Sequence, residues 1–294
     1  MIITNLYNLP EQIERFARSD KYSRGDADIS VTTLIDAPRI NKLRELHANE
    51  LSVDLSERVW SLFGTAVHHI LEEAGETPDT VHEERIFTKF NGWTLSGAID
   101  VQRTKPDGTL ALMDYKVCSV WSVLSDKPDW ERQLNCYAWL IRREKQIEVT
   151  DLQICAFVRD WSRRKASYDD NYPDSPIAVI DVPVWDYEKQ EEYVLERVIK
   201  HQSAQTSFDF TDPLPLCTDE ERWAKPSKWA VMKDGRKTAV KIYDSEEEAN
   251  LHIKVADKPD GLYVDHRKGE FIRCAGNFCG VAEFCEQYKG DEHV

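Results

Sequence analysis

The chain has 294 residues, of which 41% are hydrophobic and 31% are charged, a composition that supports a folded core and excludes a disordered or low-complexity chain. It has no apolar run near the ~20 residues that a bilayer crossing needs, and residues 1–10 lack the pattern of a secretory signal. Its 38 Lys and Arg stand against 53 Asp and Glu, a net charge of −15, which excludes a globally basic nucleic-acid binder but allows local positive patches. We therefore expect a cytoplasmic globular protein with no membrane partner.

Hydrophobic periodicity predicts the elements in chain order. A helix over 10–18 is followed by a helical pattern over 30–73. The period then changes to two, which predicts strands near 83–90, 92–103 and 109–117. Further along, we expect a helix over 130–143, strands over 152–159 and 177–185, and a helix over 187–202.

The order of these elements predicts an α/β protein with a mixed central sheet flanked by helices. We expect a peripheral segment over 1–29, a core domain over 30–205 and a C-terminal module over 206–294. Within the module, residues 223–256 are expected to form a small inserted ββα element.

A tight turn at 106–108 sets the register of the hairpin that contains it. A three-residue loop with Gly108 in the left-handed conformation places Asp100 opposite Asp114, and the period of two places Lys116 on the same face as Asp114. Two carboxylates roughly 5 Å apart repel each other unless a positive charge lies between them. A divalent cation, Mg²⁺ or Mn²⁺, explains the pattern economically.

The alternative for this triplet is an ordinary surface hairpin with cross-strand Asp and Lys pairs. The apolar residues that precede both acids weigh against that interpretation, since charged groups at the ends of buried strands are often functional. On the predicted helices, His68 and its neighbour His69, and the pair Gln133 and Tyr137, are each also compatible with plain helix-surface positions.

Four segments in this order resemble the motifs of the PD-(D/E)XK nuclease superfamily, in its RecB-like exonuclease branch: Gly64 to His68, Gly97 to Asp100, Asp114 to Lys116, and Gln133 to Tyr137. The resemblance covers about residues 30–205. It implies a restriction-endonuclease-like core and a metal-dependent DNA nuclease, an exonuclease that hydrolyses phosphodiester bonds.

The resemblance also implies roles for individual residues. It selects His68 over His69 and assigns the catalytic metal to the side chains of His68, Asp100 and Asp114 and to the main-chain carbonyl of Tyr115. Lys116 is implied to attend the attacking water, and Gln133 and Tyr137 to steady the lysine and the DNA. Asp114 stands where many members have Glu, which shortens the reach to the metal. Glu83 and Glu84 are interpreted as paired surface glutamates rather than ligands of a second metal.

Seven cysteines in a chain without a signal argue against a disulfide framework. Three of them, Cys118, Cys136 and Cys155, fit as small buried hydrophobes. The remaining four are enough for an iron-sulfur cluster or a zinc ion: Cys217, Cys274, Cys279 and Cys285. The spacing lacks the Cys-x2-Cys pairs typical of zinc ribbons, and it resembles the 4Fe-4S cluster that closes several RecB-like nucleases. The first gap of the trio and the position of Cys217 depart from that pattern.

Two local basic patches are candidate DNA contacts, because phosphate attracts charge and bases stack on aromatic rings. One patch surrounds Trp161, and the other lies between Trp223 and residue 241. The residues that we assign to DNA are Arg163, Arg164, Lys165, Lys228, Lys233, Arg236 and Lys237. The alternative for each patch is a solvated face with core tryptophans.

The sequence therefore predicts a nuclease that binds single-stranded DNA or duplex ends in recombination, repair or end processing. Proteins of this kind are frequent in phage and plasmid modules, which would place this one in the host cytoplasm with recombination or CRISPR partner proteins. A CRISPR-associated nuclease that trims spacer precursors, a non-catalytic DNA-binding protein with the same fold, and an RNA nuclease are the alternatives.

Overall fold

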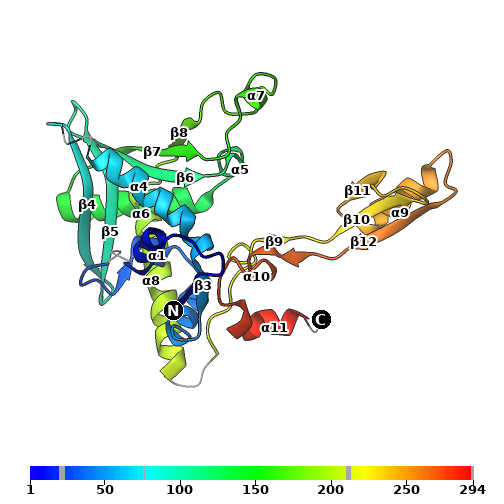
Figure 1. Ribbon diagram of the computed structural model, residues 1–294, viewed down its shortest axis with the longest axis horizontal. Coiled ribbons are helices and arrows are strands. Elements are labelled where there is room, and N and C mark those ends of the chain that lie inside the picture. The colour runs from blue at the N-terminus through cyan, green and yellow to red at the C-terminus, as the bar shows by residue number, and fades with distance from the viewer. Residues whose placement is uncertain (20–23, 74, 76, 210–212, 293–294) are drawn as a thin grey trace. The chain divides into compact units, whose positions relative to one another are not determined.

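The computed structural model describes residues 1–19, 24–73, 75, 77–209 and 213–292. The chain divides into two compact units (Figure 1). Unit 1 comprises Met1–Lys42 and His47–Pro215, and unit 2 comprises Leu43–Leu46 and Leu216–Val294. Among the described helices, none combines the length and the apolar character needed to cross a membrane.

Unit 1 is built on a mixed sheet, which has six strands in the described part of the chain. Its strands are β2 (Ile29–Ser30), β4 (Thr80–Phe90), β5 (Trp93–Thr104), β6 (Leu110–Cys118), β7 (Val149–Val158) and β8 (Ile177–Val182). Their order is β2-β5-β6-β7-β8, with β4 paired to β5. The β2–β5 and β6–β7 pairs are parallel and the others antiparallel, so the expected mixed central sheet is confirmed.

Helices flank this sheet, as expected. In Figure 1, α4 (Val59–Glu72) lies across one face and α6 (Pro128–Lys145) lies on the other. The remaining helical elements of unit 1 are α1 (Glu11–Arg18), α2 (Val31–Leu34), the 3₁₀ helix η1 (Leu55–Arg58), α5 (Val120–Leu124), α7 (Arg163–Ala166) and α8 (Tyr187–Asp209), together with the start of α3 (Pro38–Leu46).

The core of unit 1 lies between α6 and the sheet. Residues 133–141 of α6 are all buried, and Trp139, Leu134 and Leu140 pack in one cluster with residues of β5, β6 and β7. Pro128 opens the helix, where its missing N–H costs nothing, and Gln146 ends it in the left-handed conformation, with φ 58°. The apolar stretch of α6 therefore fixes the helix, and with it Gln133 and Tyr137, against the sheet.

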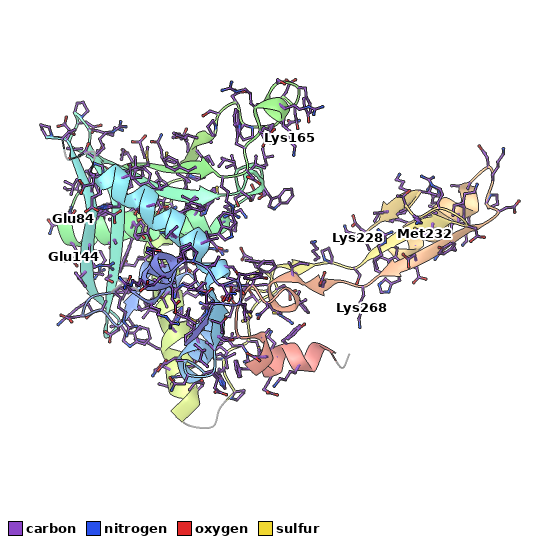
Figure 2. All side chains as sticks on the ribbon, in the orientation of Figure 1. Glu84, Glu144, Lys165, Lys228, Met232 and Lys268 are labelled. Atoms are coloured by element: carbon purple, nitrogen blue, oxygen red, sulfur yellow. The ribbon has the colours of Figure 1, made fainter. Side chains whose placement is uncertain are left out.

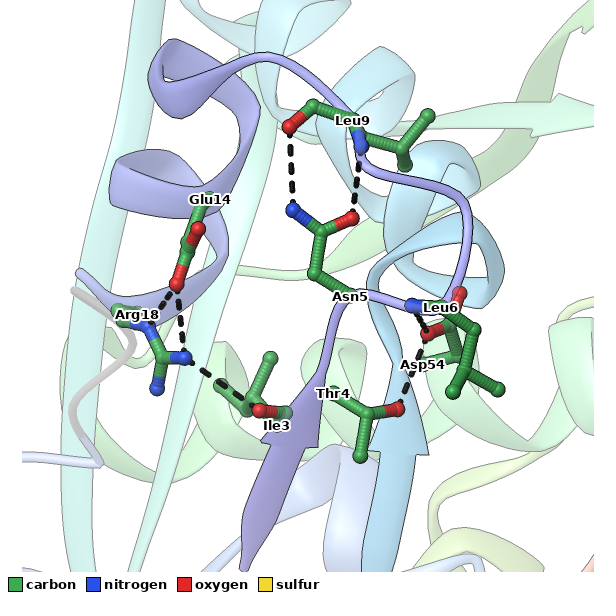
Figure 3. Close-up of polar contacts among 8 residues, drawn as sticks. All are labelled: Ile3, Thr4, Asn5, Leu6, Leu9, Glu14, Arg18 and Asp54. Atoms are coloured by element: carbon green, nitrogen blue, oxygen red, sulfur yellow. Dashed lines mark hydrogen bonds and ion pairs between the residues drawn. The ribbon is translucent and has the colours of Figure 1, made fainter.

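The N-terminal residues belong to unit 1, in a two-stranded sheet separate from the central one. Strand β1 (Ile2–Thr4) pairs in parallel with β3 (Ser52–Asp54). The Asp54 carboxylate accepts hydrogen bonds from the Leu6 N–H at 2.8 Å and the Thr4 hydroxyl at 3.0 Å (Figure 3). Hydrogen bonds hold the pKa of Asp54 well below its usual range: the Leu6 N–H lowers it most, followed by the Ser56 hydroxyl and N–H, and the Thr4 hydroxyl contributes least.

Two predicted boundaries differ from the structure. The helical pattern over 30–73 is broken into α2, α3, η1 and α4, because strand β3 interrupts it and the Asp54 side chain caps η1 directly after that strand. Residue 205 lies inside α8, and Leu214 still belongs to unit 1, where Arg39 donates to its carbonyl. The division therefore falls after Pro215. Of the predicted segments, residues 20–23, 210–212 and 293–294 lie outside the described residues.

Unit 2 contains a three-stranded sheet in the order β11-β10-β12 with α9 against it. Its elements are β9 (Ala224–Lys225), β10 (Lys228–Lys233), β11 (Lys241–Tyr243), α9 (Glu246–Val255), β12 (Leu262–Arg267), β13 (Glu270–Phe271), α10 (Ile272–Ala275), the 3₁₀ helix η2 (Ala282–Phe284) and α11 (Glu286–Glu292). The predicted ββα insert over 223–256 is thus incomplete, because β12 adds a strand that pairs with β10 along its whole length.

Close packing of α6 on β5 requires glycine at position 97. A Cβ there would lie 2.7 Å from Leu140 Cδ1 and 2.9 Å from the Tyr137 ring. We expect Gly97→Ala to lower the free energy of unfolding in urea by about 1–3 kcal/mol through overpacking. Gly64→Ala is the control, since a Cβ at Gly64 meets nothing within 4 Å and alanine is the better helix former by up to ~1 kcal/mol. Equal stability of the two variants would contradict this packing.

Candidate functional site

The β5–β6 hairpin has the register that its turn predicts. The Lys105 N–H donates to the Thr109 carbonyl at 2.8 Å, and Gly108 has φ 84°. The ladder then runs from Thr104 opposite Leu110 to Val101 opposite Met113. Continued by one step, this register would pair Asp100 with Asp114.

The two strands part at that step. Asp100 Oδ2 accepts a hydrogen bond from the Tyr115 N–H at 2.7 Å, and from there β6 pairs with β7 alone, to Cys118. On this edge of β5, β2 pairs only with residues 95–96, so residues 97–100 face a gap in the described sheet. In an extended strand the N–H and C=O of one residue point to the same side, and the Tyr115 carbonyl therefore turns toward the gap.

The other edge of β5 is irregular at the same point. Strand β4 pairs with β5 on both sides of Glu83, but Glu83 itself leaves the ladder opposite Asp100. Its φ is 50°, an uncommon conformation for a residue with a side chain. This local distortion turns the Glu83 carboxylate toward α4.

Helix α4 supplies His68, which forms a cluster with Asp100 and Glu83. His68 Nδ1 lies 3.0 Å from Glu83 Oε1 and 3.6 Å from Asp100 Oδ1. The ligand atoms of the three residues all lie within 4.8 Å of one another. The imidazole is held from its side by the Tyr115 ring, which meets it edge-on at 5.8 Å between centroids.

A second cluster, on β6 and α6, surrounds Asp114. Lys116 Nζ lies 2.5 Å from Asp114 Oδ2 and donates to Gln133 Oε1 at 3.1 Å. The Gln133 amide donates to Asp114 Oδ1 at 3.0 Å and to the Tyr137 hydroxyl at 2.8 Å. The predicted pairing of Lys116 with Asp114 on one face, and of Gln133 with Tyr137 one helical turn apart, is present.

Alternation along β6 explains how the two clusters meet. Tyr115 faces His68 on the α4 side, whereas its neighbours Asp114 and Lys116 face Gln133 on the α6 side. Asp100 lies in the gap between them, close enough that the charges of Asp114, His68 and Lys116 all act on it. The two clusters therefore lie on opposite faces of the sheet and meet at the gap beside Asp100.

Burial and like charge shape the protonation of this site. Burial, with the charge of Asp114 added to it, raises the pKa of Asp100 to about 7, and His68 opposes that shift. The hydrogen bond to Glu83 raises the pKa of His68, against the effect of burial. Three carboxylates thus face one imidazole and one ammonium, an excess of negative charge that attracts a cation.

The donor set fits a hard divalent cation. Carboxylate oxygens suit Mg²⁺ and Mn²⁺, and one imidazole is compatible with Mn²⁺. Asp114 Oδ2 is buried and forms an ion pair with the Lys116 ammonium. Asp114 nevertheless lies outside the group of ligand atoms that contains His68, Glu83 and Asp100.

Glu83 is the residue that the sequence interpretation misplaced. It is not a surface glutamate, since only 30% of its side chain is exposed and it contacts His68. Its neighbour Glu84 takes another direction, toward Gln102 at 2.7 Å and the Lys145 ammonium. The positive φ of Glu83 breaks the strand period, so alternation could not have found it; a pair of acids at a predicted strand start was the available signal.

The seven cysteines are divided between the two units. Cys118, Cys136 and Cys155 are buried in unit 1, and none of the seven, all within the described ranges, forms a disulfide. In unit 2, burial raises the pKa of the Cys274 thiol, and Cys279 and Cys285 lie close enough for their charges to add to the shift. The backbone N–H and carbonyl of Cys217 bond the Gln287 side chain, both at 2.9 Å, two residues after Cys285.

The basic residues assigned to DNA occupy both units. In unit 1, Arg163, Arg164 and Lys165 form α7 and are exposed; Figure 2 labels Lys165 there and Lys228 in unit 2. In unit 2, the exposed residues Lys233, Arg236 and Lys237 surround the turn that follows β10. Lys228 forms an ion pair with Asp244, which neutralises part of its charge. Trp229 is half-buried and stacks on His266.

Comparisons with known proteins name neither a family nor an activity. No family model matches the sequence, and no curated protein matches it. Among solved structures, SSO0001 is similar with a TM-score of 0.41 and 15% sequence identity, over 64% of this chain and 82% of that chain.

We expect Glu83→Gln to raise the dissociation constant for Mn²⁺ at least about tenfold. Loss of a residue that only hydrogen-bonds a metal ligand already weakens metal affinity by about that factor, and loss of a ligand weakens it no less. The measurement is calorimetric titration with Mn²⁺. Glu84→Gln removes the same charge one residue away and should leave the constant unchanged. A wild-type dissociation constant in Glu83→Gln, or an equal loss in both variants, would remove Glu83 from the site.

Proposed function

We propose that the protein is a metal-dependent DNA nuclease, an exonuclease, with a restriction-endonuclease-like core. One observation supports the proposal most: the side chains of His68, Asp100, Asp114 and Lys116 lie close together at the gap in the sheet. These residues lie far apart in the sequence, and a purely structural role does not explain why three carboxylates share a partly buried space. The four motif segments of the sequence support the same reading.

Residues His68, Glu83 and Asp100 would hold a divalent cation, with Asp114 and the Tyr115 carbonyl beside it. When bound, such an ion polarises the scissile phosphate and makes its water more acidic. The excess negative charge of the site explains why a cation is needed before a phosphate can approach, since carboxylates alone repel it.

Lys116 and Gln133 would act on the attacking water and the phosphate. The Lys116 ammonium is held between Asp114 Oδ2 and Gln133 Oε1, a position from which it orients water and stabilises the charge that develops on the phosphate. Gln133 is in turn fixed by Asp114 and by the Tyr137 hydroxyl. Gln133 and Tyr137 are therefore positioning residues in this proposal.

Unit 2 would hold a 4Fe-4S cluster on Cys217, Cys274, Cys279 and Cys285. Cys279 and Cys285 lie close enough to Cys274 for their charges to act on its thiol. Four thiolates are the number of ligands that such a cluster takes.

The central test is a nuclease assay with single-stranded and duplex DNA labelled at the 5′ or the 3′ end, in Mg²⁺ or Mn²⁺. We expect Lys116→Ala to lower the cleavage rate by at least roughly 100-fold while largely sparing DNA binding, because the loss acts on the transition state. The positions of the labels give the polarity of cleavage, and an RNA substrate of the same sequence tests the RNA alternative.

Lys105→Ala is the matched control, since Lys105 also pairs with an aspartate, Asp151, at 2.7 Å, but lies at the far end of the hairpin. It should cut DNA at the wild-type rate. Undiminished cleavage by Lys116→Ala would show that the site is wrong. Wild-type protein that binds DNA and never cuts it in either metal would favour the non-catalytic alternative.

For unit 2, we expect protein purified without oxygen to contain close to four iron and four sulfide per chain and to absorb broadly near ~400 nm, as iron-thiolate centres do. Cys274→Ala should lose this absorption, whereas Cys155→Ala, which removes a thiol from the core of unit 1, should retain it. Zinc in equimolar amount in place of iron would reject the cluster.

A further inference from the structure

Helix α4 exposes an unusual amount of apolar surface. None of its residues, all of which the structure describes, is buried. Trp60, Phe63 and Ile70 are exposed over 49%, 46% and 66% of their surface. A helix of a globular protein usually turns such side chains toward the core, so an apolar face of this size, beside a proposed active site, calls for a ligand.

The exposed rings of α4 continue onto the ends of β6 and β7. The Arg159 guanidinium lies 4.0 Å above the Trp60 ring, and the Arg159 N–H donates to the Cys118 carbonyl at 3.0 Å. The next residue, Asp160, accepts from the Val120 N–H at the start of α5 at 2.6 Å. Trp121 follows on α5 with 69% of its surface exposed. These contacts hold the start of α5, where Trp121 lies, beside Asp160 and next to the arginine that covers the Trp60 ring.

This surface leads directly to the proposed site. Trp60, Gly64 and His68 recur every four residues and so lie along one side of α4. The rise of an α-helix puts Trp60 about 12 Å from His68 along the axis. A Cβ on Gly64 would meet nothing within 4 Å, so the path between them is open. On β6, Lys116 lies only two residues before Cys118.

Flat exposed rings beside arginines have the chemistry of a single-stranded nucleic acid site. Each base has a face that can stack on Trp or Phe, and Arg159 can stack or bind phosphate. The exposed basic residues of α7, Arg163 to Lys165, follow closely in the chain and supply charge for phosphates. A duplex keeps its bases stacked inside, so the same rings offer it little.

We propose that Trp60, Phe63 and Trp121, with Arg159, form a stacking platform that binds a single DNA strand and guides its end to the His68 site. This rests on the proposed nuclease function and deepens it: the substrate is a single strand or an unpaired end. Phe63 extends the platform, with its ring centroid 5.9 Å from that of Trp60.

The test measures binding separately from cleavage. Fluorescence anisotropy would follow a 5′-labelled oligothymidine and a duplex of the same length, with every protein carrying Lys116→Ala so that the DNA stays intact. We expect Trp60→Ala and Trp121→Ala each to weaken single-strand binding roughly tenfold and duplex binding little. The salt dependence should stay unchanged in both, because stacking releases no counterions, whereas Arg163→Ala/Arg164→Ala/Lys165→Ala should flatten it.

Two further variants guard against loss of the fold. Trp60→Phe keeps a stacking ring and should retain most of the affinity. Tyr7→Ala removes an equally exposed aromatic side chain (70%) from unit 1, far from α4 in sequence, and should bind both DNAs as the parent does. Thermal unfolding of every variant shows whether it is folded, and Trp121→Ala, which removes a mostly exposed ring, should unfold at the parent temperature.

The outcomes distinguish a failure of the platform proposal from a failure of the nuclease proposal. Unchanged single-strand affinity in Trp60→Ala and Trp121→Ala overturns the platform, as does an equal loss on duplex DNA. Cleavage by the wild-type protein then still supports the nuclease. Ring-dependent single-strand binding with no cleavage in either metal keeps the platform and rejects the nuclease. A protein that binds no single strand rejects the platform, and its apolar face would then fit a protein partner.

Discussion

The site of unit 1 depends on one break in backbone pairing, where β6 leaves β5 after Met113. A buried N–H without a partner costs free energy comparable to a lost hydrogen bond, so the Tyr115 N–H freed by the break must find another acceptor. Asp100 Oδ2 takes that place. The hydrogen bond from the backbone thereby fixes the buried Asp100 carboxylate in place. Its other oxygen, Oδ1, faces His68. Packing of α6 on Gly97 brings Gln133 and Tyr137 to the opposite side of the same break.

Charge then decides what this arrangement can bind. Glu83, Asp100 and Asp114 share a space in which His68 and Lys116 are the nearest positive groups. Burial, and after it the charge of Asp114, raises the pKa of Asp100, because like charges repel more strongly in a medium less polar than water. A proton relieves this repulsion, and so does a cation, and a divalent ion relieves it more fully. The irregular backbone of Glu83 persists because the ladder on both sides of it holds it there.

Sequence patterns predicted the parts of this site that follow local rules. The loop at 106–108 fixed the hairpin register, and alternation placed Lys116 beside Asp114. Helical spacing paired Gln133 with Tyr137, while the choice of His68 came from family resemblance. The parts that were missed depend on contacts between distant residues. Glu83 turns inward through a backbone conformation that no periodicity encodes, and β12 carries no alternating pattern. Strand β3 and the cap at Asp54 divide the segment that the sequence pattern predicts as helical.

The small core of unit 2 agrees with the cluster that we propose for it. Its described core is small and contains mainly Ala230, Val231, Met232, Ala249 and Val281, with the buried Cys279 and Cys285. A unit of roughly 80 residues or fewer gains little from such a core and relies on crosslinks or metals. The pairing of β9 with β13 closes the base of the insert. Bonds from four thiolates to one cluster would join Cys217 to the C-terminal trio and replace the missing hydrophobic core.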